Sequence, residues 1–174
     1  MRRLPKTISH KEFLEIINNI NENEVVGLPR LKLKLAFMLG FYQCLRISEV
    51  VHLIPDDVDM ERGMLHIRQG KGQKDRDVPI MPPVVRGLRK LPIECSVRTL
   101  QRAIKRVSIR VIGKDIHFHT LRHSGATFYL NEKRVDIRQI QTLLGHSRIS
   151  TTEIFTHVSP SALKKVFDKV WEEE

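Results

Sequence analysis

The stretch His117-Phe-His-Thr-Leu-Arg-His123 is the densest polar cluster of the chain, with three histidines and one arginine in seven residues. The segment before it, residues 86–114, holds nine lysines or arginines and a single acid, Glu94, which is a local net charge of +8. Leu144-Gly-His146 adds another histidine downstream. Side chains of these types donate hydrogen bonds to anions, so the stretch predicts an anion-binding site set among helices.

Apolar residues at helical spacing predict helices on both sides of this cluster. Ser9-His-Lys-Glu12 is a capping box that starts a first helix. Pro29 suits the first turn of a second helix, which is apolar nearly all round from Leu31 to Tyr42 and therefore belongs at the centre of the core. A third, short helix follows, with Arg46 and Glu49 in its first turn. Further helices are predicted from Val97 to Val111, from about Thr120, from Asp136 to Gly145, from Ser150 through Phe155, and from Ser161 to about Trp171.

One part of the chain has a strand pattern instead. Residues 64–68 alternate between apolar and polar side chains, Gly70-Lys-Gly72 suits a turn, and residues 76–80 can form the return strand. The fold class that follows is mostly α with one small antiparallel β-sheet or hairpin, in a single domain over residues 1–174. Three prolines mark a break at the end of this part of the chain: Pro79, Pro82 and Pro83.

Composition excludes several classes of protein. Lysine and arginine total 30 against 20 acidic residues, and the resulting net charge of +10 favours a polyanionic partner, either nucleic acid or an anionic membrane surface. The longest apolar run, residues 35–42, is too short to span a membrane, and no apolar segment follows the basic start to make a signal peptide. Two cysteines, Cys44 and Cys95, are too few for a disulfide framework. These features predict a cytoplasmic location.

The basic excess is concentrated on one face of the predicted helix from Val97 to Val111. Apolar side chains form one stripe of this helix, and the opposite stripe is cationic. A charged face is usually solvated, but a stripe of one sign needs a counter-charge, which favours a surface that faces DNA phosphates. The residues of this basic stripe are Arg98, Arg102, Lys105, Arg106 and Arg110.

Three kinds of site compete to explain the polar cluster. A metal hydrolase would use its histidines, but Arg122 and the surrounding cations would repel a divalent ion. A basic nucleic-acid-binding module explains the charge, but it does not explain why Lys71 lies between two turn glycines. A metal-free phosphoryl-transfer site explains both, because arginines bind phosphate through two parallel hydrogen bonds while histidine and lysine transfer protons.

Five motifs in order give the chain a resemblance to the tyrosine recombinase family, which includes phage integrases and Xer-type recombinases. Each motif alone is modest, but five at compatible spacing form a specific signal, and the resemblance covers about residues 4–169. The motifs are Leu45-Arg-Ile-Ser-Glu49, Gly70-Lys-Gly-Gln-Lys-Asp-Arg76 with Val78-Pro79, His119-Thr-Leu-Arg-His-Ser124, Leu144-Gly-His146, and Ile149-Ser-Thr-Thr-Glu-Ile-Phe-Thr-His-Val158.

The resemblance implies a catalytic role for each matching residue. Arg46 and Arg122 would bind the scissile phosphate of DNA. Lys71 would be the general acid that protonates the departing 5′ oxygen. His119 and His146 would hydrogen-bond the phosphate, and His119 would also help to move the proton of the nucleophile.

The resemblance also implies supporting residues and the absence of a cofactor. Glu49 and His123 would support the pocket, while Lys74 and Arg76 would contact DNA. The family's reaction uses no metal, nucleotide or other cofactor, because a tyrosine forms a 3′-phosphotyrosyl link that keeps the energy of the phosphodiester.

One residue departs from the family's pattern. The nucleophilic tyrosine stands nine residues after the second patterned histidine, and Phe155 occupies that position here. Phenylalanine has no oxygen that can attack phosphorus, and Tyr42 and Tyr129 are predicted to be packing residues. The chain is therefore predicted to bind and orient DNA without cleaving it. Two explanations stay open: an engineered or recent tyrosine-to-phenylalanine change, which the presence of the other five catalytic residues favours, or a natural non-catalytic DNA-binding relative.

The organisation of the family adds further expectations. Residues 1–174 match its catalytic domain, so the N-terminal core-binding domain is expected to be absent from this chain, and residues 81–97 leave little room for the usual extra helix. Double-stranded DNA is the expected partner, with a homo-tetramer on paired DNA sites and a monomer without DNA. The last helix carries an apolar stripe that would either dock on a neighbouring protomer or pack on its own domain: Leu163, Val166, Phe167 and Val170.

Overall fold

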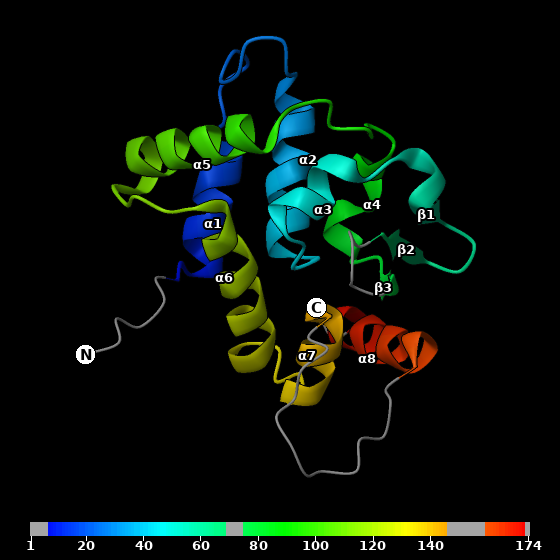
Figure 1. The fold of residues 1–174 in the computed structure, drawn as a ribbon. Helices are drawn as coiled ribbons and strands as arrows, with labels where there is room; N and C mark the ends of the chain where they lie inside the picture. The colour runs from blue at the N-terminus through cyan, green and yellow to red at the C-terminus, as the bar shows by residue number, and fades with distance from the viewer. Residues whose placement is uncertain (1–6, 69–74, 146–158, 173–174) are drawn as a thin grey trace.

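The structure, a computed structural model, describes residues 7–68, 75–145 and 159–172 (Figure 1). It confirms the predicted fold class, since helices surround one small antiparallel sheet. Its elements are α1 (His10–Asn18), α2 (Arg30–Phe41), α3 (Ile47–His52), the 3₁₀ helix η1 (Pro55–Asp57), β1 (Val58–Asp59), β2 (Met64–Ile67), β3 (Arg76–Pro79), α4 (Pro82–Leu88), α5 (Val97–Ile112), α6 (Phe118–Asn131), α7 (Ile137–Leu144) and α8 (Pro160–Glu172).

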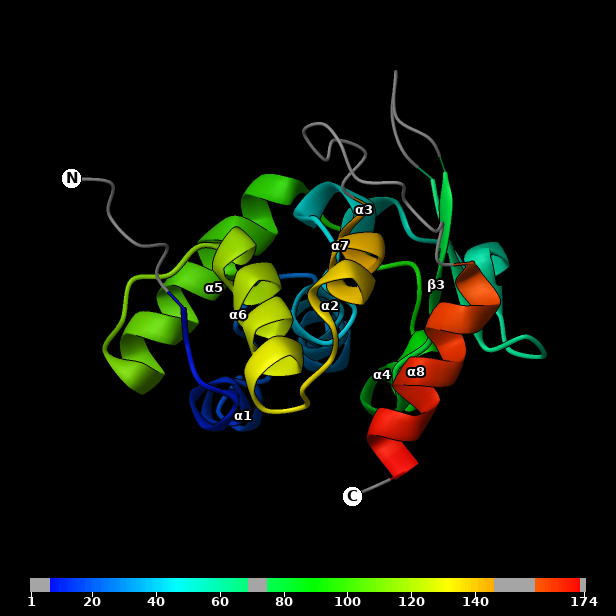
Figure 2. The ribbon, with the colours of Figure 1, turned by 90° about the horizontal axis from the view of Figure 1, so that it is seen from below.

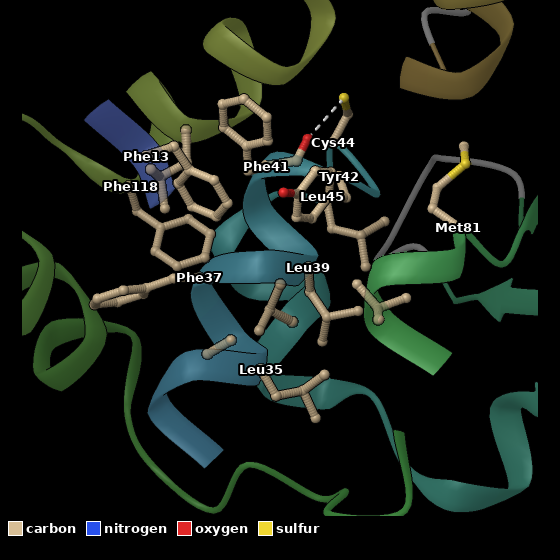
Figure 3. Packing of buried hydrophobic residues seen from close by; sticks show 14 of the residues in the cluster. Phe13, Leu35, Phe37, Leu39, Phe41, Tyr42, Cys44, Leu45, Met81 and Phe118 are labelled. Carbon is tan, nitrogen blue, oxygen red and sulfur yellow. Dashed lines mark hydrogen bonds between the residues drawn. The ribbon is translucent and has the colours of Figure 1, made fainter. Parts of the chain in front are cut away.

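Helix α2 is the centre of the core, as its all-round apolar sequence predicts. It packs against α1, α3, α4, α5 and α6, and side chains such as Phe37 and Leu39 are fully buried. Figure 3 shows these side chains leaving α2 in several directions. Aromatic stacking joins α2 to α1, where the ring centroids of Phe13 and Phe41 are 4.1 Å apart. The start of α1 has the predicted capping box between Ser9 and Glu12.

Two glycines bring α6 unusually close to α2. A Cβ atom on Gly125 of α6 would lie 1.9 Å from the main-chain oxygen of Phe41, and a Cβ atom on Gly40 of α2 would lie 2.8 Å from the ring of Phe118. Real side chains do not tolerate such distances, so both positions need glycine in this packing. Helix α6 packs on α2, and the polar cluster of the sequence is therefore carried on a helix fixed to the core.

The three strands form an antiparallel meander in the order β1-β2-β3. The register pairs His66 of β2 with Asp77 of β3, and the predicted turn of this hairpin lies outside the described residues. Helix α8 packs along β3, beside the sheet in Figure 2. Helix α8 contacts α7 as well as β3, so it joins the sheet to the helical body, and β3 is followed closely by α4.

Helices α4 and α8, near the sheet, decide two of the expectations from the sequence. The prolines at 82 and 83 do not break the structure but open α4 at its first turn, where proline lacks only a donor that would be unpaired anyway. The prediction of little room for a helix in residues 81–97 is therefore wrong. The apolar stripe of α8 packs on its own domain, because Leu163 and Phe167 are each 1% exposed and the Phe167 ring meets Tyr129 edge-on at 4.9 Å. The helix predicted from Ser150 through Phe155 lies outside the described residues.

Within the described ranges, no helix combines the length and the apolar character needed to cross a membrane.

Candidate functional site

The buried carboxylate of Glu49, on the first turn of α3, is the centre of a cluster of guanidinium groups. Arg46 comes from the start of α3, Arg76 from β3 and Arg122 from α6. We call these four residues the arginine site. Three guanidinium groups around one carboxylate leave two positive charges uncompensated among these side chains, so the site favours an anion.

Arg46 is oriented by the cap of α3. Its backbone N–H donates to Oε2 of Glu49 at 2.7 Å, and its Nη1 donates to Oε1 of the same carboxylate at 3.0 Å. Glu49 thus serves both as the N3 residue that caps the helix and as the partner of the Arg46 side chain. The side chain of Arg46 is 31% exposed, so this guanidinium remains accessible from solvent.

Arg122 is held by main-chain carbonyls of two other segments. Its Nη1 donates to the oxygen of Cys44 at 2.6 Å, and its Nη2 donates to the oxygen of Leu144 at 2.7 Å. Its Nη1 lies 3.8 Å from Oε2 of Glu49, which is longer than a hydrogen bond. Burial, together with the neighbouring charge of Arg46, lowers the pKa of Arg122 to about 10, so it stays cationic at neutral pH.

Arg76 occupies the opposite side of the carboxylate. Its Nη1 donates to Oε1 of Glu49 at 2.8 Å and its Nη2 to Oε2 at 3.2 Å, which is the bidentate geometry of a strong arginine–carboxylate pair. Its Nε donates to the oxygen of Leu143 at 3.3 Å. The sequence places Arg76 among the predicted DNA contacts, whereas in the structure its side chain is only 11% exposed and lies on Glu49.

These contacts keep Glu49 ionised although it is buried. Burial alone would raise the pKa of its carboxyl, but the hydrogen bonds and charge of Arg76, followed by the backbone N–H of Arg46 and the charge of Arg122, outweigh burial and lower that pKa below its ordinary value. The arginine site is therefore a fixed arrangement of charges rather than a set of side chains that must be ordered by a ligand.

His119 and His123 lie on α6 next to Arg122. His119 is one helical turn before Arg122, and both histidines are exposed. Their rings meet edge-on with centroids 4.3 Å apart. His117 instead caps the start of α6, and its Nδ1 is 3.0 Å from Nε2 of Gln101. The structure thus places both histidines on the helix that carries Arg122, with their side chains exposed.

Four predicted site residues lie outside the described residues: Lys71, Lys74, His146 and Phe155. The predicted roles of these residues remain predictions.

The two tyrosines of the chain are packing residues, as predicted. Tyr129 is fully buried, and its hydroxyl donates to the main-chain oxygen of Tyr42 at 2.9 Å. The Tyr42 hydroxyl is 2.8 Å from Nε2 of His10 in the aromatic cluster between α1 and α2. Both hydroxyls are thus engaged inside the core.

The basic stripe of α5 has partners within the chain that sequence reasoning missed. Arg106 and Arg110 both bind the carboxylate of Glu24, whose side chain is only 5% exposed, and Lys105 lies 3.0 Å from Asp115. Glu24 lies in the loop between α1 and α2. Only the packing of this loop on α5 brings Glu24 close to the basic stripe. Arg98 and Arg102 lie exposed at the other end of the stripe.

Known proteins resemble this chain in sequence. The sequence profile of the Phage integrase family matches residues 6–98 and 93–162. Tyrosine recombinase XerA of Pyrococcus furiosus is 34% identical over 187 residues, covering 97% of this chain and 63% of XerA. The chain thus spans somewhat less than two thirds of the length of that relative.

Solved structures resemble it in fold. A crystal structure of XerA recombinase matches with a TM-score of 0.70 at 26% identity, covering 97% of this chain and 66% of that chain. A λ integrase tetramer bound to a Holliday junction matches with a TM-score of 0.60 at 18% identity, covering 86% of this chain and 49% of that chain. At that lower identity the likeness is one of fold.

Proposed function

Because this chain belongs to the phage integrase family, we propose that its arginine site binds the scissile phosphate of double-stranded DNA as the catalytic domain of a tyrosine site-specific recombinase. The observation that carries the proposal is the shared carboxylate of Glu49. It brings Arg46 and Arg122 from two separate helices to one point, with Arg122 only 2% exposed. A tetrahedral phosphate accepts hydrogen bonds from several directions, and two oriented guanidinium groups match that requirement.

The proposed reaction exchanges one phosphodiester for another. A tyrosine hydroxyl attacks the phosphorus, the bond between phosphorus and the 5′ oxygen breaks, and a 3′-phosphotyrosyl link and a 5′-hydroxyl result. His119 would help to remove the proton of the tyrosine, and Lys71 would give a proton to the 5′ oxygen. Arg46 and Arg122 would stabilise the negative charge that grows on the phosphate oxygens. A 5′-hydroxyl of a partner duplex reverses the step, so no cofactor is consumed.

Phe155 determines what this chain can do within that reaction. It occupies the position that the family resemblance matches to the nucleophile, and it has no hydroxyl. We therefore propose that the chain binds and orients DNA but does not cleave it.

The test is the variant Phe155→Tyr with a library of duplexes whose sequence is randomised around one 5′-bridging phosphorothiolate. Cleavage of such a duplex is irreversible, so a covalent adduct accumulates. The tyrosine variant should give a protein–DNA band that survives denaturant and disappears with protease, and the parent chain should give none. The double variant Phe155→Tyr/Arg122→Ala is the control and should also give none. A band from the parent chain would show that another residue is the nucleophile.

A second candidate is a natural DNA-binding relative without catalysis, which Phe155 itself favours. The same library separates the two functions. Under the second function, duplexes retained by the parent chain are retained equally by Phe155→Tyr, and no adduct forms on any of them.

We also propose that the chain assembles as a tetramer on paired DNA sites and is a monomer without DNA. A λ integrase tetramer bound to a Holliday junction has the same fold, which supports the proposal. Sedimentation velocity with a duplex selected from the library, compared with the chain alone, tests it.

A further inference from the structure

We propose that Arg76 is a positioning residue of the arginine site: it occupies the Glu49 carboxylate so that Arg46 and Arg122 keep their donors directed at a phosphate. This proposal rests on the function proposed above, and it adds a residue to which the resemblance assigns only a contact with DNA.

The first argument is a count of acceptor positions on Glu49. A carboxylate has two oxygens with two lone pairs each, so it accepts about four hydrogen bonds. Oε1 accepts from Nη1 of Arg46 and from Nη1 of Arg76, at 3.0 and 2.8 Å. Oε2 accepts from the backbone N–H of Arg46 and from Nη2 of Arg76, at 2.7 and 3.2 Å. Arg76 therefore takes half of the carboxylate's capacity, and the four positions are filled.

The second argument concerns Arg122, which takes no place among the four hydrogen bonds to Glu49 because Arg46 and Arg76 already fill them. Its Nη1 stays 3.8 Å from Oε2 of Glu49 and donates to a main-chain carbonyl instead. Without Arg76, two lone pairs of Glu49 would be vacant beside the buried guanidinium of Arg122. A direct ion pair between them would then form, and it would compete with a phosphate for the donors of Arg122.

The third argument is that Arg76 is fixed from several sides. Its Nε donates to the oxygen of Leu143, while the next carbonyl of α7, that of Leu144, accepts from Arg122. The C-terminal carbonyls of a helix are unpaired and carry partial negative charge, so they suit cations. Gly145, which ends α7 at φ 66°, is so close that a Cβ atom there would lie 2.9 Å from the Arg76 side chain. Arg76 therefore links β3, α3 and the end of α7.

The experiment uses the full chain and inorganic sulfate, a tetrahedral dianion whose charge is constant near neutral pH. Sulfate is titrated at constant ionic strength, and the Nε–Hε NMR signal of Arg122 reports its binding. The test variant is Arg76→Gln, which keeps one amide donor but loses the charge and the parallel pair of donors. The control is Arg62→Gln, since Arg62 is 64% exposed and lies 3.9 Å from Asp77 in the same sheet region.

We expect Arg76→Gln to weaken sulfate binding about tenfold and Arg62→Gln less than twofold, which corresponds to a difference of about 1 kcal/mol. Equal effects of the two variants would overturn the proposal. Arg76→Lys keeps the positive charge but loses the parallel pair of donors, so its sulfate affinity should lie between those of the parent and Arg76→Gln. It also serves as the test variant if Arg76→Gln does not fold.

A double variant separates positioning from a merely structural role or from direct contact with the anion. If the defect of Arg76→Gln arises because Glu49 captures Arg122, removing the charge of Glu49 should release Arg122 again. Adding Glu49→Gln, which retains the cap of α3, should therefore restore at least half of the lost sulfate affinity on a logarithmic scale. A double variant that binds sulfate no better than Arg76→Gln contradicts the proposal.

The outcome can be distinguished from that of the proposed function. Sulfate binding does not require a nucleophile, so it is measured on the chain as it stands. If Phe155→Tyr yields no covalent adduct while the sulfate results are as expected, the recombinase proposal fails and the role of Arg76 at an anion site stands. If the adduct forms but the double variant shows no restoration, the role of Arg76 fails alone.

Discussion

The main-chain oxygen of Cys44 accepts a hydrogen bond of 2.6 Å from Nη1 of Arg122, although the two residues are 78 positions apart. Cys44 adopts a left-handed backbone conformation with φ 52°, which is unusual for a residue with a side chain. Its thiol is buried and donates to the oxygen of Phe41, the contact drawn as a dashed line in Figure 3. The turn that follows α2 is thus shaped so that its carbonyl meets the guanidinium of α6.

Replacement of Arg122 should therefore affect both stability and anion binding. Arg122→Ala leaves the buried oxygens of Cys44 and Leu144 without their donors, which should cost about 3 kcal/mol in the free energy of unfolding. It should also weaken sulfate binding more than tenfold. Arg106→Ala is the control, because Arg106 is 57% exposed and should change sulfate binding less than twofold. Urea unfolding and sulfate titration measure the two effects, and similar sulfate affinities in both variants would place Arg122 outside the site.

The basic stripe of α5 should divide into a DNA-facing part and a structural part. If all five of its cations met phosphates, the logarithm of the DNA-binding constant would fall with the logarithm of salt concentration with a slope of roughly −4 to −5. Arg98→Ala/Arg102→Ala should make this slope shallower by about 2 without a change in stability. An unchanged slope would mean that these two arginines do not face DNA.

The other end of the stripe should act through Glu24. Arg106→Ala/Arg110→Ala removes both arginines from a carboxylate that is almost completely buried. The free energy of unfolding should fall by about 1–3 kcal/mol, because a buried carboxylate loses its charged donors. Adding Glu24→Gln to the double variant should recover part of this loss, as urea unfolding would show. A triple variant less stable than the double variant would contradict this account of Glu24.

Gly125 should be irreplaceable even by alanine. A Cβ atom there would lie 1.9 Å from the oxygen of Phe41, so Gly125→Ala has to push α6 away from α2. We expect a loss of about 3 kcal/mol or more in the free energy of unfolding. Gly113→Ala is the matched control, because Gly113 has φ 67° but nothing lies within 4 Å of the place where its Cβ atom would stand, and the change should cost about 1 kcal/mol. Equal losses would mean that the helices can separate at little cost.

His66 should make stability depend on pH. Its hydrogen bond to Asp77, together with the charges of Asp77 and Asp75, raises the pKa of the imidazole above its ordinary value. Protonated His66 therefore stabilises the folded chain fully below about pH 6.5, and this contribution is lost as the pH rises through the folded pKa. The urea midpoint of the parent should fall over that range relative to the midpoint of His66→Gln. A parent profile parallel to that of His66→Gln would contradict the prediction.

Much of the helical architecture could be predicted from the sequence because local signals and packing agree. Ser9, Asp136 and Gly145 mark helix ends by side-chain or backbone chemistry that does not depend on the rest of the fold. Helix α4 was missed because consecutive prolines suit a helix start as well as a break, and only the packing of Val84 and Leu88 decides between them.

The arginine site could be predicted only in part. Arg46, Glu49 and Arg122 are recognisable as motif residues, whereas the inward role of Arg76 depends on strand register and on the end of α7. The pairing of Glu24 with Arg106 and Arg110 spans more than 80 positions, so no local pattern indicates it. Such long-range contacts are decided by the packed fold rather than by spacing along the chain.

The residues that contact Arg122 and Glu49 come from both halves of the chain, so the anion site can be divided between two fragments. A cut in the exposed turn at Gly113 would leave Arg46, Glu49 and Arg76 on one fragment and Arg122 with the end of α7 on the other. Neither fragment would contain the complete anion site, and α6 of one fragment would have to pack on α2 of the other. Binding of an oxyanion at Arg122 would then report the reunion of two separate polypeptides, and the anion would favour that reunion by mass action.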